Sequence, residues 1–355
     1  MDNNKRNAIL ARLSEISGDS TDAIGQAKAI AESTSDKAYR RLMSFSNVTS
    51  YSKLSKLHEC PRSYELAMYR AVVPIAEELI EAQPNYDFAF GHAVGAGIQT
   101  YGATRDLVAA QFAAFLAWKA PYDGQKTDKR GNPAGKSLPH ALIAVEKFQY
   151  FMQSELEDWN VAMLPDGRPA VEVAFAVDTG NGYFHFGHID AIIQHRETKR
   201  LAVWEGKTGS AAAVDAKYAN SYQALGYSVV VDAISKALGL PSGEYDVFYI
   251  YFSSATTEFT LLPFTKNRSQ RAEWLQDLLL DHAAIDQYKS LNFFPKRGDS
   301  CVNTWGRTCQ WFGNCHMRNS SLFPNVNLDR LEGIGELHAV DFSFTLQELI
   351  EAQKR

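Results

Sequence analysis

The pattern of apolar positions changes in character near the middle of the chain. In the first half, apolar residues recur at helical spacing over residues 51–70, 89–118 and 138–160. Pro61 interrupts the first of these segments and suits the first turn of a second helix. Residues 122–137 are polar and predict an exposed loop. The first half therefore predicts a lobe of helices.

The second half instead alternates apolar and polar residues, as half-buried strands do. A turn signal, Thr179-Gly180-Asn181-Gly182, separates the first two strands. The expected elements are strands at 169–178, 183–195, 200–209, 244–254 and 258–265, with helices at 214–238 and 267–290. This order predicts a mixed α/β (α+β) fold with a helical lobe before the sheet.

Composition narrows the class of protein. With 355 residues, 45% of them hydrophobic, the chain can bury a large core. The formal net charge of −5 excludes a basic protein that coats nucleic acid, so any contact with DNA needs a local basic cleft or bound metal. No apolar run approaches the roughly 18 residues of a membrane helix, and the first ten residues lack an apolar signal core. We expect a cytoplasmic protein without a membrane partner.

Three charged residues form the strongest candidate for chemistry. Glu205 and Lys207 lie two apart in one strand, so they share a face. If the preceding strand pairs with it as a hairpin, Asp190 faces Glu205. Carboxylates are preferred ligands of Mg²⁺ and Mn²⁺, and a nearby lysine can orient a water molecule or stabilise developing charge. A Glu-x-Lys pair alone is more often a solvated ion pair, but Asp190 and Glu205 both lie in apolar surroundings.

The stretch from Gly187 to Gly209 resembles the G-x-x-D and E-x-K motifs of the RecB-like branch of the PD-(D/E)xK nucleases. The same family carries Gln-x-x-x-Tyr in the next helix, and Gln223 and Tyr227 match it. The resemblance implies a restriction-endonuclease-like core, with a central mixed sheet flanked by helices. It also implies that Asp190 and Glu205 bind the metal, and that Gln223 and Tyr227 position the scissile phosphate and the catalytic Lys207.

One family motif departs from the pattern. The family has Gly-x-x-x-His early in a helix, and the histidine is a metal ligand. Here Gly91 matches the glycine, but Gly95 occupies the histidine position. His92 can substitute as a metal ligand, Gln99 can contribute one turn later, or His92 can simply pack or cap the helix.

The chain has four cysteines, Cys60, Cys301, Cys309 and Cys315. They resemble the set in iron–sulfur members of the same branch, including CRISPR-associated RecB-like nucleases and the AddB nuclease domain. That resemblance implies a structural [4Fe–4S] cluster, although the family's first gap between the last three cysteines is usually shorter. Zinc held by four thiolates and unligated buried cysteines are the alternatives.

The resemblance, over roughly residues 50–315, sets the expected organisation. A polar extension at 1–45 precedes one nuclease domain at 46–320. That domain contains a helical insertion at about 96–165 and a cluster-binding tail at 296–318. Residues 321–355 form a C-terminal segment that ends in an amphipathic stretch.

The expected function is hydrolysis of DNA phosphodiesters, as an exonuclease on single strands or DNA ends in repair, recombination or phage DNA metabolism. Lys53, Arg62 and Lys217 are candidates for a DNA-facing surface. Residues 131–137 resemble a phosphate-binding loop but have the wrong spacing, so any unwinding requires a helicase or recombination partner. Two rival functions remain: a catalytically inactive DNA-binding or scaffold subunit, and an endonuclease acting on structured DNA.

Overall fold

The computed structural model describes residues 21–33, 47–69, 85–120, 135–210, 215–302, 308–309, 311–312, 315 and 342–354. The chain forms two compact units, and each is assembled from three separate stretches. Unit 1 contains Met1–Asp36, Pro84–Val173 and His188–Arg268. Unit 2 contains Lys37–Gln83, Ala174–Gly187 and Ser269–Arg355.

The strands of unit 1 form a mixed sheet. β4 (Phe184–His195) pairs antiparallel with β5 (Leu201–Gly209), and β5 pairs parallel with β6 (Tyr245–Ser253). β7 (Glu258–Lys266) pairs antiparallel with β6, and the short β2 (Trp159–Val161) pairs with the end of β4. A parallel pair needs a crossover connection, and helices α10 (Asp215–Ala219) and α11 (Tyr222–Ala237) provide it between β5 and β6.

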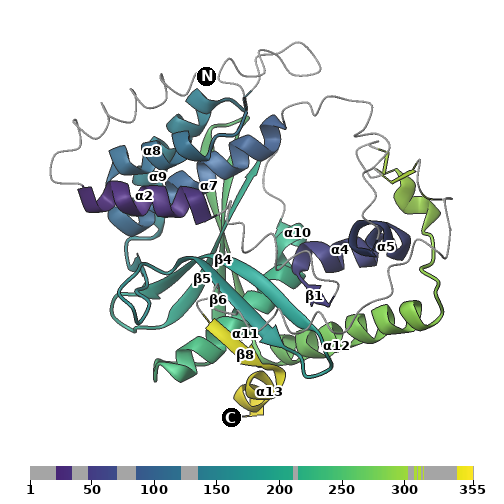
Figure 1. The fold of residues 1–355 in the computed structure, drawn as a ribbon. Helices are drawn as coiled ribbons and strands as arrows, with labels where there is room; N and C mark the ends of the chain where they lie inside the picture. The colour runs from purple at the N-terminus through teal and green to yellow at the C-terminus, as the bar shows by residue number, and fades with distance from the viewer. Residues whose placement is uncertain are drawn as a thin grey trace. The chain divides into compact units, whose positions relative to one another are not determined.

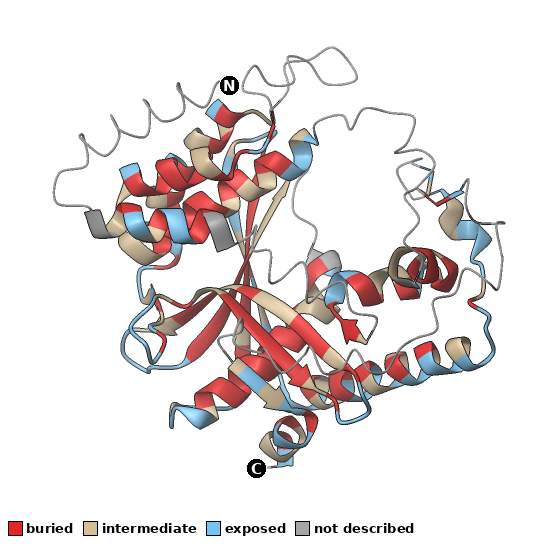
Figure 2. Ribbon diagram, in the orientation of Figure 1, coloured by how far each residue is buried: buried red, intermediate tan, exposed pale blue. Residues whose placement is uncertain are grey.

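A layer of helices in unit 1 packs on this sheet (Figure 1). Its members are α2 (Thr21–Ser33), α7 (Tyr86–Thr104), α8 (Leu107–Ala117) and α9 (Leu138–Glu155). Small residues allow close approach: a Cβ added at Gly102 of α7 would lie 2.7 Å from the Trp204 ring of β5. Figure 2 shows that both the inner strands and α7 are largely buried.

The structure divides two of the expected helices. Residues 89–118 form α7 and α8, because Arg105 adopts a left-handed conformation (φ 58°) and the Asp106 side chain caps the start of α8. The helix expected at 138–160 ends at Glu155, and the chain continues into β2. The helix expected at 214–238 is likewise split, with Ser221 capping α11.

Unit 2 combines strands and helices from distant parts of the chain. β1 (Val48–Thr49) pairs parallel with the first residues of β4, and β8 (Phe342–Thr345) pairs parallel with β3 (Val171–Asp178). α4 (Tyr51–Glu59) and α5 (Pro61–Tyr69) meet at Cys60, as the proline position predicts. The other elements of unit 2 are α12 (Arg268–Ser290), the short 3₁₀ helix η1 (Gly298–Cys301) and α13 (Leu346–Lys354).

The strand order is β7-β6-β5-β4-β3-β8, with β1 and β2 also paired to β4, which gives eight strands in the described part of the chain. The mixed α/β class with a central mixed sheet flanked by helices is therefore confirmed. The amphipathic C-terminal stretch supplies β8 and α13, so it docks on β3 within unit 2.

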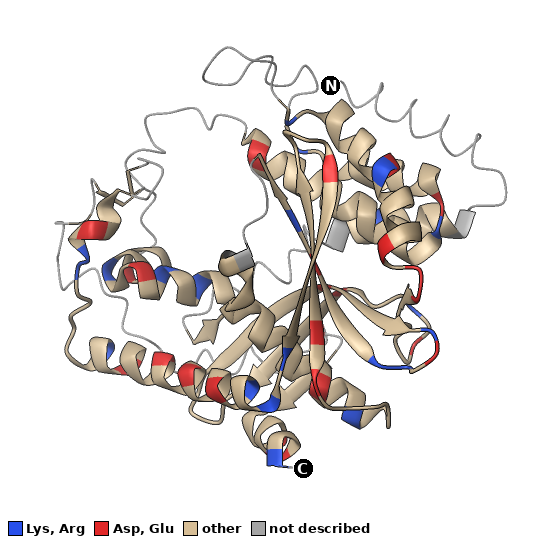
Figure 3. Ribbon diagram, turned by 180° about the vertical axis from the view of Figure 1, so that it is seen from behind, with Lys and Arg blue, Asp and Glu red and all other residues tan. Residues whose placement is uncertain are grey.

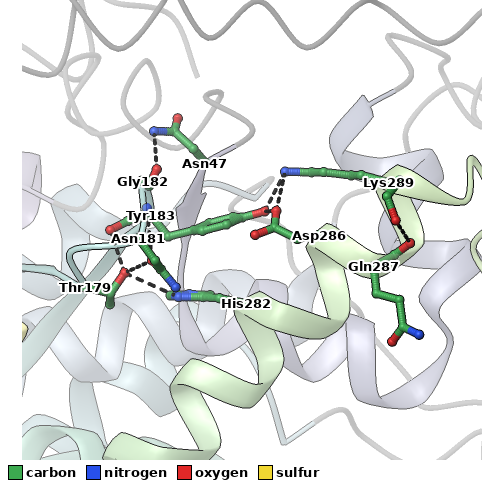
Figure 4. A network of polar contacts seen from close by, with 10 residues as sticks. Asn47, Thr179, Asn181, Gly182, Tyr183, His282, Asp286, Gln287 and Lys289 are labelled. Atoms are coloured by element: carbon green, nitrogen blue, oxygen red, sulfur yellow. Dashed lines mark hydrogen bonds and ion pairs between the residues drawn. The ribbon is translucent and has the colours of Figure 1, made fainter.

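A buried polar network fixes α12 within unit 2, and Figure 4 shows the part of it around Tyr183 and His282. Thr49 contacts both His185 (Oγ1 to Nδ1, 3.3 Å) and His282 of α12 (Oγ1 to Nε2, 3.0 Å). The Tyr183 ring stacks on His282 with centroids 4.5 Å apart, and its hydroxyl donates to Asp286 at 2.6 Å. Acidic residues recur along the same helix (Figure 3). The network ties β1, the β3–β4 turn and α12 together.

Candidate active site

Strands β4 and β5 bring two carboxylates and one amine together. Ala191 pairs with Trp204, so the next step of the antiparallel register places Asp190 opposite Glu205. The backbone N–H of Gly206 donates a 2.7 Å hydrogen bond to Oδ2 of Asp190. Lys207 lies on the same face of β5 as Glu205, and its Nζ donates to Oε1 of Glu205. The arrangement places three charged groups at one point of the sheet.

Helix α11 supports the lysine. Nζ of Lys207 also donates to Oε1 of Gln223 at 3.2 Å, and Nε2 of Gln223 donates to the Tyr227 hydroxyl at 2.8 Å. Gln223 and Tyr227 lie four residues apart, so they share a helical face. Burial raises the pKa of Tyr227 well above its usual value, and the Glu205 and Asp190 charges add to the shift, so the phenol stays neutral. The structure thus connects four of the sequence-predicted residues in one chain of contacts.

A third carboxylate, Glu172 of β3, lies near enough to Glu205 and Asp190 for their charges to interact, and the sequence pattern did not predict it. Oε1 of Glu172 accepts a 2.8 Å hydrogen bond from Nε2 of Gln99 in α7. Glu172 has a φ of 50°, and such a conformation costs a non-glycine residue about 1–3 kcal/mol. A polar residue between Val171 and Val173 was the available signal, but strand alternation alone accounts for it.

The three carboxylates influence one another. Burial raises the pKa of Asp190 well above its usual value, and the charges of Glu205 and Glu172 raise it further, against the opposing effects of Lys207 and the Gly206 N–H. Burial raises the pKa of Glu172 to about 7; the bond from Gln99 opposes this shift and Glu205 adds to it. Burial would lower the pKa of Lys207, but Glu205 and Asp190 hold it above its usual value. A bound proton or cation therefore relieves the crowding of negative charge.

Two buried oxygens of this cluster could accept a cation. Oε2 of Glu205 and Oε1 of Gln99 have no hydrogen-bond partner among the described residues, and the two side chains are only 2% and 3% exposed. A buried acceptor without a partner is costly. Within the same residues, no three His, Cys, Asp or Glu side chains are placed so that together they could hold a metal ion. Mg²⁺ commonly binds through one or two carboxylates and keeps several waters, so hard oxygen donors of this kind fit Mg²⁺ or Mn²⁺.

Gly95, which occupies the histidine position of the helix motif, has free space where a side chain would begin. A Cβ at Gly95 would meet no atom within 4 Å, whereas one at Gly91 would lie 3.4 Å from Oγ1 of Thr208 on β5. His92 packs its ring against Phe88 with centroids 4.0 Å apart, and burial lowers its pKa, with a smaller contribution from Lys119. Its role as a metal ligand stays a prediction.

Comparison with known families settles the classification. Residues 48–316 match the model of the PD-(D/E)XK nuclease superfamily. The chain belongs to the PD-(D/E)XK nuclease superfamily. The match includes β4, which carries Asp190, and β5, which carries the Glu-x-Lys motif. It also includes α11, which carries the Gln-x-x-x-Tyr motif. Members of this superfamily are typically metal-dependent phosphodiesterases that act on DNA. A search of curated proteins found no match.

The four cysteines line one cavity of about 300 Å³ in unit 2. All four thiols are free and partly exposed. Partial burial raises the pKa of Cys301, and the proximity of Cys315, Cys309 and Cys60 raises it further. The N–H of Cys309 donates to the carbonyl of Cys301 at 2.7 Å. Ser300 also donates to the carbonyl of Glu59 at 2.6 Å, which joins the tail to the end of α4. Four free thiols therefore line one cavity, although no three of these described cysteines are placed so that together they could hold a metal ion.

The three basic residues expected to face DNA lie in different settings. Lys53 is buried, donates to the carbonyl of Val48, and has its pKa lowered to about 7, mainly by burial and secondarily by Lys56. Arg62 is buried and paired with Glu65. Neither side chain forms an exposed basic surface, and the side chain of Lys217 in α10 lies outside the described residues. No helix in the described ranges is long and apolar enough to cross a membrane.

Proposed function

We propose that the chain is a Mg²⁺- or Mn²⁺-dependent deoxyribonuclease that hydrolyses DNA from ends or single strands as an exonuclease. The observation that supports this proposal is the convergence of Asp190, Glu205 and Lys207, together with the buried Oε2 of Glu205, which has no partner in the described part of the chain. Asp190 and Glu205 would hold the cation. When bound, such an ion polarises a phosphoryl oxygen and lowers the pKa of an attacking water.

Other residues of the chain would have separate roles in binding and orienting the substrate. The ammonium of Lys207 donates to Glu205 and Gln223, and its third N–H would donate to a water or a phosphate oxygen of the substrate. Tyr227 fixes the amide of Gln223, so it acts as a positioning residue one step removed from the substrate. The Gly206 N–H keeps Asp190 directed at the same point.

A structural [4Fe–4S] cluster on Cys60, Cys301, Cys309 and Cys315 is part of the proposal, and zinc is the rival occupant. Lys56 and Arg297 also line the cavity, and their positive charges suit a centre held by thiolates. The centre would join the break between α4 and α5 to the tail that follows α12. A role in repair, recombination or phage DNA metabolism, alongside a helicase or recombination partner in the cytoplasm, rests on the resemblance alone.

One experiment separates the candidate functions. Purified full-length protein is incubated with end-labelled linear single-stranded DNA and with circular single-stranded DNA, in Mg²⁺, Mn²⁺ or a chelator. An exonuclease degrades the linear substrate in the presence of metal and leaves the circle intact. Cleavage of the circle would establish an endonuclease. Binding of DNA without cleavage of either substrate would favour the inactive scaffold, for which the glycine at position 95 is the specific support.

A further inference from the structure

One face of helix α7 is turned toward the carboxylate cluster. Gly91, Gly95, Ile98 and Gln99 share it at helical spacing. Cδ1 of Ile98 would lie 3.4 Å from a Cβ at Gly206, and Gln99 donates to Glu172. Gly95 lies between these contacts and has open space around its Cα. The helix therefore presents the amide of Gln99 to this side of the site, and position 95 itself supplies no imidazole.

Glu172 and Gln99 are oriented by each other. Nε2 of Gln99 is used in the bond to Glu172, which leaves Oε1 of Gln99 as an acceptor without a partner among the described residues. Amide carbonyls and carboxylates are both ordinary ligands of hard divalent cations. Oε2 of Glu205 is a second such oxygen, so two buried acceptors from different elements have no donor within the described ranges.

The backbone of β3 is adapted to this placement. Glu172 adopts a positive φ at the start of a strand whose next five residues, from Val173 to Val177, are buried. Outliers of this kind persist where the surrounding structure enforces them, and they concentrate at functional sites. A solvated strand position would not require that conformation, or an amide partner from a helix 73 residues away in sequence.

We propose that Glu172 and Gln99 complete the divalent-cation site of Asp190 and Glu205, in place of the helix histidine that is absent at Gly95. The proposal rests on the proposed nuclease function. All four proposed ligands are oxygen donors, which suits Mg²⁺ and Mn²⁺.

Manganese binding to the full chain tests this directly. Electron paramagnetic resonance measures the binding of Mn²⁺, and melting curves give the melting temperature with and without Mn²⁺. Both are recorded for wild type, Glu172→Gln, Gln99→Leu and Asp190→Asn. Glu146→Gln, on the exposed side of α9, is the matched control. We expect Glu172→Gln and Gln99→Leu to weaken Mn²⁺ binding about tenfold or more, and Glu146→Gln to leave it unchanged.

The melting temperatures separate a ligand from a structural residue. Removing one of three facing carboxylates should raise the melting temperature of metal-free Glu172→Gln and reduce the increase that Mn²⁺ produces. Adding Gly95→His to Glu172→Gln should restore part of the lost affinity, because the space at position 95 accepts a side chain.

The failure patterns are distinct. If Asp190→Asn loses Mn²⁺ while Glu172→Gln and Gln99→Leu bind it as wild type does, the nuclease site stands and the completing role of Glu172 and Gln99 is overturned. If wild type itself binds no Mn²⁺, the proposed function and this inference both fall.

Discussion

Oδ2 of Asp190 accepts a 2.7 Å hydrogen bond from the backbone N–H of Gly206, the residue between Glu205 and Lys207. The bond joins the acid of β4 to the Glu-x-Lys motif of β5 through the main chain. The relative placement of Asp190 and Glu205 is therefore fixed by strand pairing, and it does not depend on the freedom of long side chains. Substitutions that keep this bond should separate chemistry from folding.

Asp190→Asn is such a substitution, because the amide oxygen can still accept from Gly206. We expect the metal-free protein to melt at or above the wild-type temperature, since a buried like charge is removed. We expect the rate of DNA cleavage to fall about a thousandfold or more, since a metal ligand contributes several kcal/mol to the transition state. Single-turnover cleavage at saturating Mg²⁺ measures the loss. Near-wild-type cleavage by Asp190→Asn would exclude this carboxylate from the metal site.

Gln223 and Tyr227 should act as one unit. Tyr227→Phe removes the hydroxyl that accepts from Gln223, and we expect kcat to fall about tenfold with little change in KM. Gln223→Leu should cost more, because it also removes a contact to Lys207. In a double-mutant cycle the two losses should not add, since both act through the same lysine. Fully additive losses would show that Tyr227 does not act through Gln223.

The sequence could predict that Asp190, Glu205 and Lys207 lie together, but it could not predict that Glu172 lies near them. Asp190, Glu205 and Lys207 could be placed because strand periodicity and hairpin register are local, and both survive in the structure. Glu172 could not be placed in this way. Its position depends on a positive φ and on a bond to Gln99 in a distant helix, and neither leaves a local pattern.

The same distinction applies to the fold. The strands β3 to β7 were predictable from alternation, whereas the break between α7 and α8 depends on the left-handed conformation of Arg105. The pairing of β8 with β3 joins segments more than a hundred residues apart and depends on the tertiary packing of a four-residue strand.

The four cysteines that line the cavity of unit 2 predict that the purified protein contains a metal centre. Anaerobically purified protein should contain iron and acid-labile sulfide and show a broad visible absorbance band. Cys309→Ser should lose most of the iron and lower the melting temperature, because the proposed centre would join the tail to α4 and α5. Ser63→Ala, which changes a polar group of the same cavity, should retain the iron. One zinc per chain without sulfide would replace the cluster with a zinc site.

The histidines of unit 2 predict a loss of stability in acid. Burial lowers the pKa of His185 to about 3, with a contribution from His282, and lowers the pKa of His282 to about 4, with a contribution from Lys289. Both are neutral when folded and bind protons when unfolded below about pH 6.5. Acidification from about pH 6.5 toward 4 therefore favours unfolding, by up to about 1.4 kcal/mol per pH unit for each histidine.

Urea unfolding between pH 7 and 4.5 measures this slope, and His282→Gln should flatten it. His58 provides a contrast of opposite sign. Its hydrogen bond to Asp281 raises its pKa, so its contribution is fully present below about pH 6.5 and lost as the pH rises through the raised value. His58→Gln should therefore steepen the loss in acid. An unchanged slope in His282→Gln would show that the buried network does not exclude protons.

The most direct test of the proposed nuclease is metal-dependent cleavage by wild type and by Lys207→Ala. End-labelled linear single-stranded DNA is incubated with each protein in Mg²⁺, in Mn²⁺ and in a chelator, after melting curves have shown that both are folded. We predict that wild type degrades the DNA only when metal is present and that Lys207→Ala is slower by about a hundredfold or more. Cleavage by Lys207→Ala at the wild-type rate, or no metal-dependent cleavage by wild type, would contradict the proposal.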